Sequence, residues 1–203
     1  QGRYAYFNQP GITKWNLARF AESLIPLIDD NKDKAIEIAT ETINGFAELY
    51  KKNWFEMMRK KLGLLGEDLK DEGLIIDLLT WMHQNKADYT NTFCYLMNEK
   101  IKEDKIYSNE GFISWKQQWQ ERLKLHNNSP EKYLKLMHSS NPLVIPRNHK
   151  VEEALEAANN DDLNPMKNLL KILEKPYENQ EGISEYQSPA PASDKKYQTF
   201  CGT

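Results

Sequence analysis

Apolar residues recur every three or four positions along most of the chain, which is the spacing of one face of an α-helix. The longest stripe runs through residues 36–57, and glycines at 63 and 66 end it. Thr13 is a candidate cap for an earlier helix, and Ser129 followed by Pro130 is a strong helix start. No alternation typical of a β-strand is long enough to compete. The pattern therefore predicts an all-α, multi-helix domain.

The same spacing predicts further helices at residues 67–86, after a turn and cap at Asp88-Tyr89-Thr90, after Ser108, at 151–158 and at 163–173. Two prolines predict an extended segment at residues 141–148. After Pro176, Pro, Ser, Gln and Glu replace the aliphatic residues, which is typical of an arm without its own core. We therefore predict a helical domain at 1–176 and an extended C-terminal tail at 177–203.

The composition narrows the class of protein. Hydrophobic residues make up 39% and charged residues 28%, a balance typical of a globular protein that buries a core. The net charge of −3 argues against nonspecific nucleic-acid binding. No apolar run approaches the ~20 residues of a membrane span, so we expect no membrane partner. The 2 cysteines cannot form a disulfide framework, which predicts a cytoplasmic location.

Catalytic motifs are not apparent in this sequence. It contains neither a GxGxxG nor a GxxxxGK[ST] phosphate loop. The histidines are far apart and lack metal-ligand spacing; they are His83, His126, His138 and His149. The aromatic stripes are more typical of a core than of a ligand cavity, and Cys94 has the pattern of an inert core residue. We therefore predict no catalytic, cofactor-binding or metal-ligating residue in this chain.

Cys201 is the candidate redox residue. A thiol at the third-last residue of the chain can oxidise, cross-link or capture a metal. Tyr197 and Phe200 could anchor the tail and hold this thiol at a defined position. An incidental exposed cysteine is the alternative interpretation.

Several segments, taken in order, resemble the C-terminal part of the selenoprotein O (SelO/YdiU) family. They are residues 2–6, 9–17, 88–93, 141–149, 151–154, 175–177 and 197–203. The most specific are the Pro-Arg-Asn-His motif at 146–149 and the Cys-Gly-Thr terminus at 201–203. Together the segments cover essentially the whole chain.

The resemblance implies a fold and an activity for a longer parent protein. Members of this family have a pseudokinase fold and bind ATP inverted relative to kinases. With two divalent cations, normally Mg, they transfer AMP from ATP to hydroxyl side chains of proteins. The resemblance places this chain at the end of a kinase-like C-lobe and in a helical extension. It also implies that the cysteine matching Cys201 controls activity by oxidation, and that Cys94 is not its disulfide partner.

The family's ATP-clamping, catalytic and metal-binding residues all precede the segment that this chain resembles. We therefore expect this chain to be an inactive scaffold and regulatory portion, without ATP or Mg of its own. Its expected partners are the missing N-terminal catalytic half and, for the parent, protein substrates. An apolar face left exposed could also pair two copies as a homodimer.

Two other readings stay open. The chain could be a stand-alone helical module that binds a partner protein through its aromatic-rich surface. It could also be a redox factor that uses Cys201 as a single reactive thiol. Whether the chain is itself an enzyme is left undecided.

Overall fold

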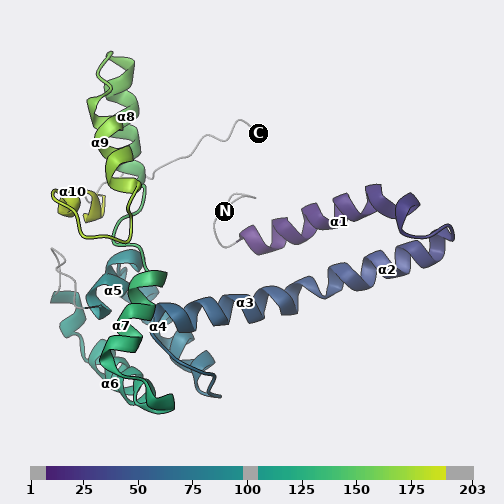
Figure 1. The fold of residues 1–203 in the computed structure, drawn as a ribbon, viewed down its shortest axis with the longest axis horizontal. Helices are drawn as coiled ribbons and strands as arrows, with labels where there is room; N and C mark the ends of the chain where they lie inside the picture. The colour runs from purple at the N-terminus through teal and green to yellow at the C-terminus, as the bar shows by residue number, and fades with distance from the viewer. Residues whose placement is uncertain (1–7, 98–104, 191–203) are drawn as a thin grey trace. The chain divides into compact units, whose positions relative to one another are not determined.

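The structure, a computed structural model, describes residues 8–97 and 105–190 (Figure 1). Within these ranges every regular element is a helix, which confirms the all-α prediction. The α-helices are α1 (Gln9–Ile28), α2 (Lys32–Asn44), α3 (Phe46–Lys61), α4 (Asp71–Asn85), α5 (Tyr89–Leu96), α6 (Glu110–Leu123), α7 (Pro130–Ser140), α8 (Asn148–Asn159), α9 (Asn164–Leu173) and α10 (Ile183–Gln187). Short 3₁₀ turns, η2 (Lys105–Ser108) and η3 (Leu125–Asn127), flank α6.

The chain divides into two compact units between Met57 and Met58. The first unit contains α1, α2 and most of α3, and the second contains α4 to α10. The predicted boundary between residues 176 and 177 stays a prediction.

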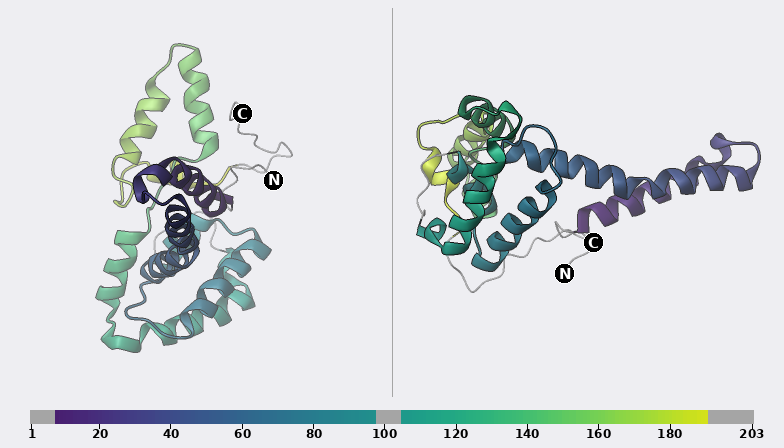
Figure 2. Two further views of the ribbon diagram at one scale, coloured as in Figure 1. Left: turned by 90° about the vertical axis from the view of Figure 1, so that its right-hand side faces the viewer. Right: turned by 90° about the horizontal axis from the view of Figure 1, so that it is seen from below.

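The first unit is a helical hairpin in which α1 and α2 run antiparallel (Figures 1 and 2). Asn31 caps α2, since its side-chain oxygen accepts hydrogen bonds from the backbone N–H groups of Asp33 and Lys34. Gly45 keeps a helical backbone between α2 and α3. The long helical stripe that the sequence predicts is therefore nearly continuous.

The predicted start of the first helix is wrong. Thr13 lies inside α1, which begins at Gln9, and Pro10 occupies its first turn. Proline suits that position because its fixed φ is helical and the missing N–H would have no partner there. Predicted caps hold at two other helices, where Asp88 accepts from Asn91 N–H and Ser129 accepts from Lys132 N–H.

The first unit buries almost nothing. Helix α1 has no buried residue, and Ala35 is the one buried residue among positions 8–57. Large apolar side chains are exposed instead, including Trp15 at 48%, Phe20 at 60% and Leu27 at 82%. A small unit that buries so little apolar surface has no core of its own.

The core lies in the second unit, among α4, α5, α6 and α7. Its largest fully buried side chains include Phe93, Phe112, Met58, Leu62 and Ile75. The indole N–H of Trp115 donates to Leu74 O and that of Trp119 to Leu62 O, both at 2.8 Å. The aromatic stripe of α6 is therefore core, as predicted, with its polar atoms satisfied.

A buried ion pair joins α6 to the start of α4. Arg122 Nε and Nη2 donate to the two carboxylate oxygens of Asp71 at 2.7 and 3.1 Å. Arg122 Nη2 also reaches the carbonyl oxygens of Leu65 and Gly66. The bonds to Leu65 and Gly66 fix the loop that follows α3. The bonds to Asp71 stabilise both buried charges, because a buried charge is costly unless it is paired and hydrogen-bonded.

Part of the segment predicted as an extended tail is folded. Residues 183–187 form α10, in which Ile183 and Gln187 are buried. Gln187 Nε2 donates to Leu143 O at 3.0 Å, and Leu143 N–H donates to Pro176 O at 2.7 Å. A few contacts with residues distant in sequence hold this short helix in place. The amino-acid composition of the segment does not reveal such contacts. Residues 191–203 lie outside the described residues.

Candidate functional site

The predicted redox residue, Cys201, lies outside the described residues, as do Tyr197 and Phe200. Its assignment therefore stays a prediction. The other cysteine, Cys94 on α5, is fully buried, and its Sγ lies 3.9 Å from Pro142 O. This matches the prediction that Cys94 is a core residue.

The structure does not bring the four histidines together into a ligand set. In residues 8–97 and 105–190, no three side chains of His, Cys, Asp or Glu gather closely enough to hold a metal ion. None of the helices described there has both the length and the apolar character to cross a bilayer.

The most developed polar site is a junction between α5 and the segment that leads into α8. Asp88 caps α5, and Arg147 precedes α8. Arg147 Nη1 and Nη2 donate to the two carboxylate oxygens of Asp88 at 2.7 and 3.0 Å. This bidentate geometry is the strong form of an ion pair, because both donors of the guanidinium fork are matched. Arg147 Nη2 also lies 3.3 Å from Asn91 Oδ1.

The junction keeps Asp88 ionised. Burial alone would raise the pKa of Asp88, but hydrogen bonds from Arg147 and from Asn91 N–H outweigh it, so the pKa lies below its ordinary value. A carboxylate held this way is a structural anion. It is a poor proton acceptor for catalysis, because a general base needs a pKa near the working pH.

A second layer of bonds carries the junction to α10. Asn91 Nδ2 donates to Gln187 O at 3.2 Å, and Gln187 in turn bonds to Leu143 O. Asn91 is buried, and both the nitrogen and the oxygen of its side-chain amide form hydrogen bonds. The network ties α5, the segment at residues 141–147 and α10 into one support.

Lys61, at the end of α3, lies beside this support. Its ammonium stands 4.5 Å from the ring centroid of Phe93 and 5.4 Å from that of Tyr89. Its Nζ lies 3.4 Å from Ser140 O, and the residue is 8% exposed. Burial lowers the pKa of Lys61 to about 8, against a smaller opposing influence from Cys94.

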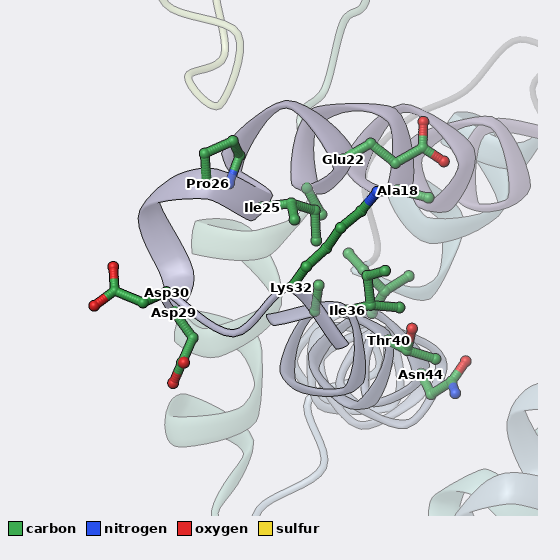
Figure 3. A pocket seen from close by; sticks show the side chains of 13 residues that line it. Ala18, Glu22, Ile25, Pro26, Asp29, Asp30, Lys32, Ile36, Thr40 and Asn44 are labelled. Carbon is green, nitrogen blue, oxygen red and sulfur yellow. The ribbon is translucent and has the colours of Figure 1, made fainter. Parts of the chain in front are cut away.

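A second candidate site is a groove of about 920 Å³ within the first unit (Figure 3). Its walls come from α1 and α2 and the turn between them. The apolar lining residues are Ala18, Ala21, Ile25, Pro26, Ile36, Ala39 and Ile43. The polar and charged ones are Glu22, Asp29, Asp30, Lys32, Thr40 and Asn44. A concave, mostly apolar surface of this size is suited to binding.

Sequence reasoning missed both sites. The caps and the Pro-Arg-Asn-His motif were visible, but nothing in the sequence pairs Asp88 with Arg147 across 59 positions.

Comparison with known proteins decides the family. The family model described as "Protein adenylyltransferase SelO" matches residues 1–174. The chain belongs to the SelO family. The segments at residues 88–93 and 141–149, which carried the resemblance, are those that the Asp88–Arg147 pair joins. Both halves of the junction lie within the residues that the family model matches.

Curated SelO-family relatives carry the name "Protein nucleotidyltransferase YdiU". The protein of Pelagibacter ubique is 57% identical over 202 residues, covering 100% of this chain and 42% of its own length. That of Alcanivorax borkumensis is 48% identical over 204 residues, with the same two shares. That of Clostridium perfringens is 47% identical over 202 residues, covering 100% of this chain and 41% of its own length. The chain thus spans less than half the length of these relatives.

Proposed function

We propose that this chain is the C-terminal scaffold and regulatory portion of a protein adenylyltransferase. In the whole protein, a hydroxyl oxygen of a substrate protein attacks the α-phosphorus of ATP. The bond to the β-phosphate breaks, pyrophosphate leaves, and the hydroxyl loses its proton. The observation that carries this proposal is membership of the SelO family, whose curated relatives are named as protein nucleotidyltransferases.

We further propose that ATP and Mg bind to the part of the protein that this chain does not span. Three cationic side chains of the described residues are engaged within the chain itself. Arg122 pairs with Asp71, Arg147 pairs with Asp88, and Lys61 lies against aromatic rings. This supports a phosphate clamp located elsewhere in the longer protein.

The geometry supports a bracing role for this chain. Phosphoryl and nucleotidyl transfer depend on positioning and on stabilisation of charge. A rigid support for those groups is favoured by polar contacts that lock side chains in place, such as the hydrogen bonds that join Asp88, Asn91 and Arg147. These contacts hold α5 and α10 in fixed register.

The decisive test compares the 203-residue chain with the longer protein. Each is incubated with Mg²⁺, a mixture of proteins and ATP labelled at the α-phosphate. We expect label on protein only with the longer form. ATP labelled at the γ-phosphate is the matched control and should transfer nothing, because the γ-phosphate leaves with pyrophosphate. Label from the γ position would indicate a kinase, and label from the short chain alone would refute the scaffold assignment.

We further propose that Cys201 places this activity under redox control. Peroxide should inhibit AMP transfer by the longer protein, and a thiol reductant should restore it. Cys201→Ser should abolish the inhibition, whereas Cys94→Ser should leave it intact because Cys94 is buried. Inhibition that persists in Cys201→Ser would remove the regulatory role of that thiol.

A stand-alone interaction module is the second candidate, and the exposed apolar side chains of the first unit favour it. A start codon close to Gln1 would support this alternative. A reading frame that extends several hundred residues upstream, with kinase-type lysine, asparagine and aspartate motifs, would support the adenylyltransferase. A cytoplasmic location and homodimer formation stay predictions.

A further inference from the structure

The groove between α1 and α2 is open although its walls are apolar. Figure 3 shows Ile25 on α1 and Ile36 on α2 facing the same hollow. Ile36 is 43% exposed. Exposing such side chains is unfavourable, since each square ångström of apolar surface left in water forfeits about 25 cal/mol. An occupant that covers the groove would recover this energy.

Small residues line the walls and set the kind of occupant. Ala18 and Ala21 are one turn apart on α1, and Ala39 lies on α2. Short side chains let another backbone approach closely, as in packed helix pairs. A helix is about 10 Å wide, so a groove of about 920 Å³ holds roughly two turns of it. The geometry therefore suits a helix.

The occupant must be present whenever the first unit is folded. With Ala35 as its one buried residue among positions 8–57, this unit lacks the core that a small domain needs. A tethered segment meets this need, because its effective concentration is in the millimolar range, whereas a second copy depends on protein concentration. More than half of each curated relative lies outside the match, so such a segment is available in the family.

We propose that this groove binds an amphipathic helix from the part of the polypeptide that precedes residue 1. This inference rests on the proposed function for the existence of that part, and adds where it docks. Two turns of apolar side chains insert between α1 and α2.

The first test identifies the occupant directly in the longer protein. Thr40 is exposed and lines the groove, whereas Thr42 on the same helix is exposed and does not. Each is replaced in turn by the photo-crosslinker p-benzoylphenylalanine, and the products are mapped by mass spectrometry. We expect Thr40 to cross-link to residues before position 1, three or four apart in sequence. The yield from Thr42 should be at least tenfold lower.

Three results would overturn the inference. They are cross-links from Thr40 to a second copy, which mixed isotope labelling reveals; cross-links to other residues of this chain; and a Thr40 yield no higher than that of Thr42. None of these results depends on AMP transfer, so the cross-linking reports on docking even if the proposed activity is wrong.

A second test uses two isoleucines on α2. Ile36 and Ile38 are 43% and 40% exposed, but only Ile36 lines the groove. In the longer protein, the cross-link yield from Thr40 should fall at least tenfold in Ile36→Glu and stay within twofold in Ile38→Glu. Equal effects would refute the docking site. Cross-linking to residues before position 1 in a longer protein that transfers no AMP would refute the proposed function and leave the docking site standing.

Discussion

Arg147 and Asp88 form a bidentate ion pair across 59 positions of sequence, with both donors of the guanidinium fork on the carboxylate at 2.7 and 3.0 Å. The pair joins the cap of α5 to the start of α8. It is more buried than a surface ion pair, with side-chain exposures of 9% for Arg147 and 23% for Asp88. Breaking the pair should therefore lower the stability of the whole second unit.

Breaking this pair should destabilise the protein. Arg147→Met leaves Asp88 charged and half-satisfied, and we expect a loss of about 2–3 kcal/mol in the free energy of unfolding. Arg147→Lys should not rescue it, since an ammonium lacks the planar fork. Urea unfolding followed by circular dichroism measures both. Glu121→Gln, which breaks the exposed Lys124–Glu121 pair, is the control and should cost at most ~0.5 kcal/mol. Equal losses in Arg147→Met and the control would contradict the role given to the junction.

The same pair predicts a pH dependence. Because the folded pKa of Asp88 lies below its ordinary value of 3.8, the ionised form contributes stability above that value. This contribution disappears as the pH falls through the folded pKa. The stability difference between wild type and Asp88→Asn should therefore be constant near neutrality and shrink below about pH 4. Urea titrations at several pH values test this, and a difference that grows in acid would refute it.

Lys61 should make the free energy of unfolding depend on pH in the alkaline range. Its pKa is lowered to about 8 in the folded protein from 10.5, so the unfolded chain binds more protons between these values and stability rises with pH. The free energy of unfolding of Lys61→Met relative to wild type should fall as the pH rises from 8 to 10.5, by at most about 3 kcal/mol. Lys61→Arg keeps its charge and should show no such change relative to Lys61→Met. A flat profile for wild type against Lys61→Met would contradict the lowered pKa.

Replacing Gly63 or Gly73 by alanine should change the stability of the protein in opposite directions. Gly63 has φ +68°, and a Cβ there would lie 2.9 Å from Tyr133 Cβ. Gly63→Ala should therefore destabilise the protein by roughly 1–3 kcal/mol through strain and crowding. Gly73 lies inside α4, where an added Cβ would meet no neighbouring atom within 4 Å, so Gly73→Ala should stabilise by about 0.5–1 kcal/mol. Thermal unfolding of both variants checks the signs, and a shared sign would contradict one of the two assignments.

Helices were the most predictable part of this protein. The stripe at residues 36–57, the caps at Asp88 and Ser129, and the buried stripe of α6 all follow from local spacing and capping chemistry. Local rules failed at the first helix, where the sequence offers two possible N-termini. The helix begins at Gln9 and not after Thr13, because Pro10 is well suited to the first turn of a helix.

The two sites depend on contacts that local rules do not contain. Nothing near Asp88 in sequence indicates that Arg147 is its partner, and nothing near residue 183 indicates that α10 is held by Asn91 and Leu143. The sequence by itself determined the helical class and the caps at Asp88 and Ser129, because each is encoded within a few turns of chain. It also indicated the family, through short segments spread over the whole chain. Only the tertiary structure decided which charges are paired, how far the pKa of Lys61 is lowered and where the open groove lies. Burial and pairing are properties of residues brought together from distant positions.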